Sequence, residues 1–372
     1  MKRSKQLFKL NDKFKLNDRV YISLFKYGVS IVLFILLGSL LIMSQGVDPI
    51  SATRVLFEGT FGSKRAFGNV LRWTAPCILT GAAASVAFKA GVMNLGIEGQ
   101  VLLGGFVAGV LGAFLELPPA LHILVCVIAG GIAGMLYAVI PAVLRLFFNI
   151  NEFITTMMLN YVANFLTQYL TQQVLAGGLE VWGYVNMQAT PTIQKSAVLP
   201  TIIPGTSATL AFPVALLIAF AIAFLYKRTI QGYELKQVGE NLRFSKTGGV
   251  RVVRSFMTIF LLSGLIAGIA GGIEVIGTYK KFNTGFAAFY GYDGISIARI
   301  AELDSIAVII VSFIWAVLKA GSMQVERVLQ VNRLTVTILQ YIFVLFVAID
   351  YAGIYNRYQD RKIKKRIREG EL

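Results

Sequence analysis

Carboxylate and amide side chains lie inside several apolar stretches of this 372-residue chain. Such groups are costly at membrane depth unless they face protein or a water-filled path. The clearest case is the segment 91–100, GVMNLGIEGQ, which places an acid and two amides between two stretches able to cross a bilayer. Amides and carboxylates bind hydroxyl groups, and aromatic rings pack against flat or apolar faces. The pattern predicts a path for a small polar solute, lined by Asn94, Glu98, Asn160, Asn164, Glu274, Phe289, Tyr292 and Asp293.

Each of these polar residues also has a purely structural interpretation. Asn160 and Asn164 are four residues apart and so share one helix face. An amide on a membrane helix can instead bond to a neighbouring helix, at about 0.6 kcal/mol per contact. Glu98 lies near the expected start of a helix, where the helix dipole favours a carboxylate. The sequence leaves both interpretations open.

Enzymatic chemistry has little support in the sequence. His122 is the only histidine, which excludes clusters of metal-binding histidines, and no Gly-x-x-x-x-Gly-Lys-Ser/Thr phosphate loop is present. Cys77 and Cys126 lie in apolar runs and are expected to be small buried hydrophobes rather than part of a disulfide or a metal site. We therefore expect a transport protein that is not an enzyme and that holds no metal or cofactor.

Composition indicates the elements that must position these residues. Hydrophobic residues make up 56% of the chain and charged residues only 15%, whereas soluble domains carry about 25% charged residues. Nine apolar stretches reach or approach the ~20 residues that a bilayer crossing needs. If both termini are on one side the number of crossings is even, so the short apolar segment 290–301 is expected to be a tenth, short or broken helix. The expected fold is an all-α integral membrane bundle of about ten crossings, with the nine long spans near 27–44, 69–88, 96–115, 120–141, 153–171, 208–226, 256–277, 305–320 and 334–350.

Positive charge is concentrated in three blocks that flank apolar spans, and the net charge is +16. The positive-inside rule places these blocks in the cytoplasm, which explains them better than nucleic-acid binding does. We expect a basic cytoplasmic segment at 1–26, a transmembrane domain at 27–351 with a cytoplasmic loop at 227–255, and a basic cytoplasmic tail at 352–372. The loop 173–207 is expected on the outside.

Glycines at four-residue spacing indicate where helices pack closely. Each row leaves a flat stripe on one helix face, which allows close backbone approach. Packing within the subunit is a simpler explanation for any one row than a dimer contact. The rows are Gly105 with Gly109, Gly130 with Gly134, and Gly264 with Gly268 and Gly272.

Three short segments, in order along the chain, resemble signatures of one transporter family. Residues 88–100 (FKAGVMNLGIEGQ), 151–161 (NEFITTMMLNY) and 291–295 (GYDGI) are similar to segments of permease subunits from nucleoside and simple-sugar ABC importers. These subunits are part of a larger family that includes ribose and branched-chain amino-acid permeases. The likeness runs from about residue 25 to 352, and three matches in order are more specific than any single one.

The resemblance implies a division of labour within a complex. Such permeases work in a bacterial-type plasma (inner) membrane with a second related permease, an ATP-binding-cassette ATPase of tandem domains and an extracytoplasmic substrate-binding protein. Residues 232–239 (GYELKQVG) resemble the cytoplasmic segment that docks on the ATPase, although the residues that follow, 243–246 (RFSK), are larger than is usual in the family. The implied coupling residues are Glu234, Gly239, Arg243 and Gly249.

The function hypothesis is therefore a permease subunit of an ABC importer that forms the translocation path for a small polar solute, with nucleosides as the favoured substrate. Ribose or another simple sugar would present similar hydroxyl groups and remains an alternative for the same kind of complex. A different class, an ion-coupled secondary transporter or channel, would also show buried carboxylates and broken helices. The two classes differ in energy coupling, because only the ABC permease needs an ATPase.

Overall fold

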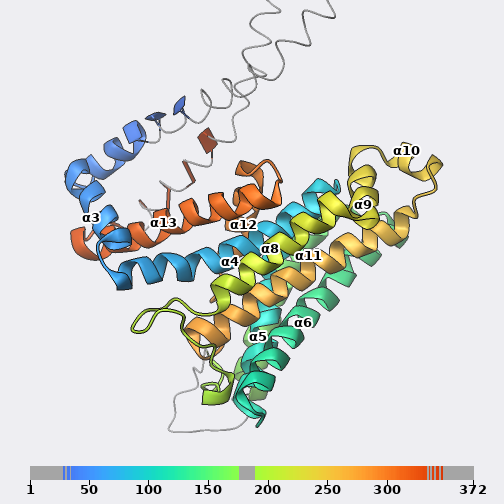
Figure 1. Cartoon of the computed structure of the whole chain (residues 1–372), viewed down its shortest axis with the longest axis horizontal. Coiled ribbons are helices and arrows are strands. Elements are labelled where there is room, and N and C mark those ends of the chain that lie inside the picture. The colour runs from blue at the N-terminus through green and yellow to red at the C-terminus, as the bar shows by residue number, and fades with distance from the viewer. Residues whose placement is uncertain are drawn as a thin grey trace, which may run out of the picture. The chain divides into compact units, whose positions relative to one another are not determined.

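The computed structural model describes residues 28–29, 32–33, 35–175 and 189–332, with scattered positions from 335 to 346, and these residues are largely helical (Figure 1). The terminal segments 1–26 and 352–372 lie outside the described residues, as does most of the expected span 334–350.

Six of the described helices are long and apolar enough to cross a membrane, so the protein is a multi-pass helical membrane protein. All six coincide with spans predicted from the sequence, although α6 and α13 extend beyond the predicted ends, to Phe148 and Leu329. The six are α4 (Lys64–Lys89), α5 (Ile97–Phe114), α6 (Pro119–Phe148), α8 (Ala211–Arg228), α11 (Val252–Glu274) continued by the π-helical turn η3 (Val275–Tyr279), and α13 (Ser305–Leu329).

Two further helices, α7 and α12, also lie where the sequence predicts a span, but one is more polar and the other is short. α7 (Glu152–Tyr169) fills the expected span 153–171, but it carries two asparagines and a glutamine and is not among the six most apolar helices. α12 (Tyr290–Ile300) is an 11-residue helix and confirms the short element expected at 290–301. The remaining short elements are α3 (Pro49–Phe61), η1 (Leu170–Leu175), η2 (Lys195–Ala197), α9 (Ile230–Glu240) and α10 (Leu242–Thr247).

The chain divides into two compact units, Met1–Val55 with Ser322–Leu372, and Leu56–Gly321. In the first unit, the described residues include a helical stretch at 35–43, the start of α3 and the end of α13. The second unit contains helices α4 to α12 and most of α13. All the contacts analysed below lie in this second unit.

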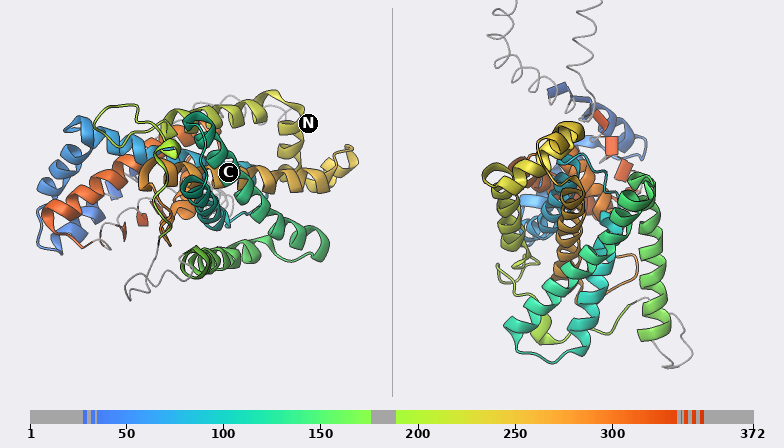
Figure 2. Two further views of the ribbon diagram at one scale, coloured as in Figure 1. Left: turned by 90° about the horizontal axis from the view of Figure 1, so that it is seen from below. Right: turned by 90° about the vertical axis from the view of Figure 1, so that its right-hand side faces the viewer.

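Helix α4 is the centre of the second unit. In its most apolar window 94% of the residues are buried, against 28% in the corresponding window of α6. α4 packs against α8, α11 and α12, while α7 lies beside the pair formed by α5 and α6 (Figure 2). A run of small residues, Ala82, Ala83 and Ala84, lets these neighbours approach α4 closely. The outer surfaces of α6, α8 and α13, whose apolar windows are only 28–33% buried, are suited to lipid.

The glycine rows predicted from the sequence pack helices α5, α6 and α11 against each other. A Cβ atom at Gly264 would lie 2.6 Å from the carbonyl oxygen of Gly134, and one at Gly130 would lie 2.9 Å from that of Gly104. The row formed by Gly105 and Gly109 instead faces the segment that leads from η3 to α12. Backbones therefore touch where side chains are missing, which confirms the prediction of close packing within the subunit.

The turn before α13 is held by a carboxylate. Asp304 accepts hydrogen bonds from the amides of Ile306 (2.9 Å) and Ala307 (3.1 Å), as an N-cap residue does. It also pairs with Lys227 at the end of α8, at 3.5 Å. Burial raises the pKa of Asp304, but the two amide hydrogen bonds and Lys227 outweigh that effect, so its pKa lies below the usual value.

Candidate functional site: paired charges around helix α12

The polar segment 91–100 forms the turn between α4 and α5, and Asn94 holds it from inside. Asn94 is completely buried, and its Nδ2 donates to Ser263 Oγ on α11 (2.9 Å) and to Gln100 Oε1 (3.2 Å). Its Oδ1 accepts from the amide of Gly96 at 3.0 Å. Asn94 thus ties the start of α5 to α11, which is the structural interpretation of this residue.

Asn160 fastens α7 to the same turn. Its Oδ1 accepts from the Gly99 amide and its Nδ2 donates to the Leu95 carbonyl, both at 2.9 Å. The hydroxyl of Thr156, one turn earlier, accepts from the Leu95 amide at 3.1 Å. Asn164 lies one turn beyond Asn160 on the shared face, is half-buried, and is not part of these contacts. The four-residue spacing therefore does not give the two asparagines the same role.

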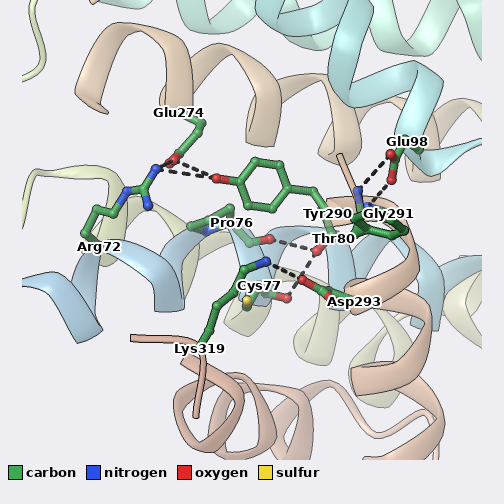
Figure 3. Close-up of polar contacts among 11 residues, drawn as sticks. Arg72, Pro76, Cys77, Thr80, Glu98, Glu274, Tyr290, Gly291, Asp293 and Lys319 are labelled. Atoms are coloured by element: carbon green, nitrogen blue, oxygen red, sulfur yellow. Dashed lines mark hydrogen bonds and ion pairs between the residues drawn. The ribbon is translucent and has the colours of Figure 1, made fainter. Parts of the chain in front are cut away.

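Glu98 caps a helix other than its own. Its carboxylate accepts from the amide of Phe289 (2.9 Å) and from the amide of Gly291 (3.1 Å), at the N-terminus of α12 (Figure 3). Phe289 has a left-handed backbone (φ 71°), and a Cβ atom at Gly291 would lie 2.5 Å from the Glu98 amide nitrogen. The dipole effect expected for Glu98 thus applies to α12, whose first bonded amide is 191 residues further on, as well as to the start of α5.

Two ion pairs flank α12, of which one is buried and the other has a lysine that is 17% exposed. Glu274, at the end of α11, pairs with Arg72 of α4, and the Tyr290 hydroxyl donates to the same carboxylate oxygen at 2.9 Å. Asp293, one turn along α12, pairs with Lys319 of α13 at 2.5 Å. We call Arg72, Glu274, Tyr290, Asp293 and Lys319 the ion-pair cluster (Figure 3). Four helices contribute to it, and its formal charges cancel.

Aromatic rings surround the two cations of the ion-pair cluster. The Arg72 guanidinium lies 3.8 Å from the centroid of the Trp73 ring. The Lys319 ammonium lies 4.6 Å from the same ring and 5.0 Å from that of Tyr290. Desolvated cation–π contacts of this kind contribute about 2 kcal/mol each. They offset part of the cost of burying four charges between membrane helices.

Sequence reasoning missed the two cations of this cluster. Arg72 and Lys319 each stand inside an apolar span, where an ionisable residue is rare and indicates a functional site with a partner. Their signal is therefore present in the sequence, although neither residue belongs to the basic blocks that flank the spans.

Five of the eight predicted path residues gather at the N-terminal half of α12. Phe289 is 53% exposed, Tyr292 is half-buried, and their rings lie 6.3 Å apart. Glu98 caps this end of α12, and Glu274 and Asp293 belong to the ion-pair cluster beside it. Asn94 and Asn160 lie instead at the start of α5, and Asn164 lies further along α7.

The segment 227–255 contains the predicted coupling residues. Glu234 lies on α9, Gly239 near the end of α9, Arg243 on α10, and Gly249 in the turn before α11. The backbone of Gly239 touches the turn after α4: a Cβ atom at Gly91 would lie 3.0 Å from the Gly239 Cα. The polar segment 91–100 is therefore in direct contact with this segment.

The described part of the chain contains no candidate metal site and no disulfide bond. It contains no group of three or more His, Cys, Asp or Glu side chains that could hold a metal ion. Cys77 and Cys126 are both free and buried.

The fold and the site define a multi-pass membrane protein whose helices bury paired charges. Residues 66–349 match the family described as branched-chain amino acid transport system / permease component, and the chain belongs to this family. It is 32% identical over 339 residues to the guanosine ABC transporter permease protein NupP of Bacillus subtilis, covering 91% of this chain and 96% of that protein.

Two other relatives show the range of the family. The glucose ABC transporter permease protein TsgB13 of Haloferax volcanii is 30% identical over 83% of each chain. The nucleoside ABC transporter permease protein NupB of Lactococcus lactis is 27% identical over 79% of this chain and 82% of its own length. The chain is thus the permease subunit of an ABC importer and not an enzyme, and the alternative of an ion-coupled secondary transporter or channel is excluded.

Proposed function

We propose that this permease subunit forms the translocation path for nucleosides. The observation that carries the proposal is the grouping of carboxylates and aromatic rings at α12, in a chain similar over most of its length to permeases named for guanosine and nucleosides. A nucleoside presents ribose hydroxyls, which donate hydrogen bonds to carboxylates, and a flat base, on which an aromatic ring can stack.

The proposed path passes the N-terminal half of α12. Phe289 and Tyr292 cover the base, and Glu98 and the ion-pair cluster lie beside them. Asn94 and Asn160 support the path by fixing the start of α5, and Asn164 lines it further along α7. Buried ion pairs are a poor source of stability, because well-packed apolar residues are often as stable. Three buried charges and one largely buried lysine at one place therefore favour a role in transport.

Uptake by the reconstituted importer tests this proposal. Phe289→Ala should lower the uptake of labelled guanosine about tenfold, since one aromatic stack contributes about 1.4 kcal/mol. Phe165→Ala is the matched control, because Phe165 is also exposed (65%) but lies on α7. Unchanged guanosine uptake by the Phe289 variant would overturn the proposed path.

A simple sugar is the second candidate substrate, favoured by the similarity to a glucose permease. A sugar has hydroxyls but no base, so carboxylates would matter and a stacking ring would matter less. The same assay separates the two substrates. If labelled glucose or ribose accumulates in the proteoliposomes and guanosine does not, the sugar proposal replaces the nucleoside proposal.

The proposed complex contains a second related permease, a tandem-domain ATPase and an extracytoplasmic binding protein. Bacillus subtilis has a further guanosine ABC transporter permease protein, NupQ, that is 25% identical to this chain over 213 residues, which supports a pair of permeases. Glu234, Gly239, Arg243 and Gly249 are the proposed contact with the ATPase. Co-purification with a tagged ATPase tests the partnership, and recovery of this chain alone would count against it.

We propose ten crossings with both termini and the segment 227–255 in the cytoplasm. The basic ends of α8 and α11 meet at α9 and α10, in agreement with the positive-inside rule. Lys246 is exposed on α10 and suits a single cysteine, in a background without Cys77 and Cys126. Labelling of Lys246→Cys on intact cells by an impermeant reagent would refute this orientation.

A further inference from the structure

A polar cavity lies between α9 and the first turns of α11. Its volume is about 360 Å³, within the range of small-molecule sites and larger than an inorganic phosphate needs. It is separate from the ion-pair cluster, with which it shares no residue. Its lining residues are Gln231, Glu234, Leu235, Gly249, Arg251, Arg254, Ser255 and Thr258.

The cavity has an excess of positive charge from two arginines. Arg251, the N-cap residue of α11, and Arg254, in its first turn, both line the cavity. Neither forms an ion pair with another described residue, and Glu234 is the one acidic residue in the lining. Guanidinium groups bind phosphate oxygens through paired, charge-assisted hydrogen bonds. The cavity therefore has the donors that an anionic ligand requires.

The N-terminus of α11 adds backbone donors on the same side. Arg251 is the N-cap residue of this 23-residue helix, and its side chain makes no capping hydrogen bond. The first amides of a helix lack partners within the helix, and the dipole there favours negative charge.

Ser255 is a second, independent sign of a ligand. Its side chain lines the cavity although the residue is only 5% exposed. Among the described residues its hydroxyl has no hydrogen-bond partner, whereas the Thr258 hydroxyl donates to the Arg254 carbonyl at 2.8 Å. The hydroxyl is open to the cavity, where it can donate a hydrogen bond to an oxygen of a ligand.

We propose that this cavity binds a phosphate ester, with Arg251, Arg254 and Ser255 holding the phosphate. Glu234 and Gln231, across the cavity on α9, supply acceptors for a hydroxyl or amino group on the rest of the ligand. The phosphate ester is either a free phosphorylated small molecule or the headgroup of an anionic lipid.

Binding at this site would act on α9. Leu235 lines the cavity from α9, and Gly239, one turn later, touches the end of α4. A ligand would thus hold α9 against α11 next to the segment 91–100. Any effect of the bound ligand on ATPase coupling rests on the proposed function, whereas the binding of the ligand to the cavity does not.

Thermal melting of the purified full-length chain tests the binding. In nanodiscs of phosphatidylcholine, glycerol 3-phosphate should raise the melting temperature and glycerol should not, if the ligand is a free phosphate ester. If the ligand is a lipid headgroup, nanodiscs that also contain phosphatidylglycerol should raise it instead. Because no transport is measured, a failure of the proposed nucleoside path leaves this result unaffected.

Variants identify the site. The double variant Arg251→Gln/Arg254→Gln should bind the effective probe at least about tenfold more weakly. The control Arg228→Gln/Lys246→Gln removes two exposed charges outside the lining and should bind like the wild type. Should the arginine variant fail to fold, Ser255→Ala should still weaken binding about threefold. No stabilisation of the wild type by either probe, or equal losses in the arginine variant and its control, would overturn the proposal.

Discussion

The contact between α9 and the end of α4 leaves no room for a side chain at Gly239. A Cβ atom there would lie 2.6 Å from the Lys89 carbonyl oxygen and 2.7 Å from the Ala90 Cα. Carbon contacts are favourable at about 3.5 Å, so Gly239→Ala requires the two backbones to separate by roughly 0.8 Å. Backbone atoms cannot rotate aside, and overpacking of this kind costs about 1–3 kcal/mol.

We expect Gly239→Ala to uncouple ATP hydrolysis from uptake. A shift of about 1 Å in a positioning element can lower a rate about a hundredfold, and α9 is the proposed link between the ATPase and the segment 91–100. The measurement is the amount of labelled guanosine imported per ATP hydrolysed, in proteoliposomes that hold the whole complex. The ratio should fall about tenfold or more, while the variant still inserts and assembles.

A matched control lies in the same segment. A Cβ atom at Gly248 would meet its nearest neighbour, the Phe244 carbonyl oxygen, at 3.4 Å, which is an ordinary contact. Gly248→Ala should therefore keep the wild-type ratio. If Gly239→Ala also kept it, the close backbone contact would have no part in coupling and the reasoning would be refuted.

Three further predictions concern the buried charges and amides. Arg72→Met should destabilise the chain by about 3–5 kcal/mol, because it leaves the carboxylate of Glu274 buried without its cation. The double variant Arg72→Met/Glu274→Leu should melt near the wild-type temperature yet import no guanosine. Normal guanosine uptake by the double variant would contradict a transport role for the pair. Asn160→Leu should cost about 1–3 kcal/mol by leaving the Gly99 amide and the Leu95 carbonyl without their side-chain partner. Asn164→Leu should cost less, and equal melting temperatures of the two variants would argue against this difference. The pKa of Asp304 is lower in the folded chain, so its charge stabilises above its unfolded value of about 3.9 and that contribution is lost as the pH falls through the folded value. Asp304→Asn, which keeps the cap, should therefore melt below the wild type at neutral pH and together with it in strong acid, and a constant difference would show that the charge is not the cause.

The membrane helices are the part of the fold that could be predicted from the sequence. The segment predicted at 120–141 is α6 (Pro119–Phe148), and the one predicted at 290–301 is α12 (Tyr290–Ile300). The glycine rows also predicted where α5, α6 and α11 approach each other. Helix length and apolar content are local properties, because each segment must satisfy its own backbone in lipid.

The roles of the polar residues could be predicted only in part. Asn160 and Asn164 share a helix face, as their spacing requires, but only Asn160 meets the backbone of α5. Glu98 lies at a helix N-terminus, as expected, yet the amides that it binds belong to α12. A spacing along one helix indicates which side chains point together, and it carries no information on which neighbouring helix they meet.

The sequence by itself determined that this protein is a helical membrane permease, since hydropathy, basic blocks and short signatures are all read along the chain. Only the tertiary structure decided that Glu274 meets Arg72, 202 residues earlier, and that Asp293 meets Lys319. The physical reason is that a charge in a membrane span must find a partner, but nearly any helix of the bundle can supply it. The close packing of small residues around α4 and α11 determines which helices meet.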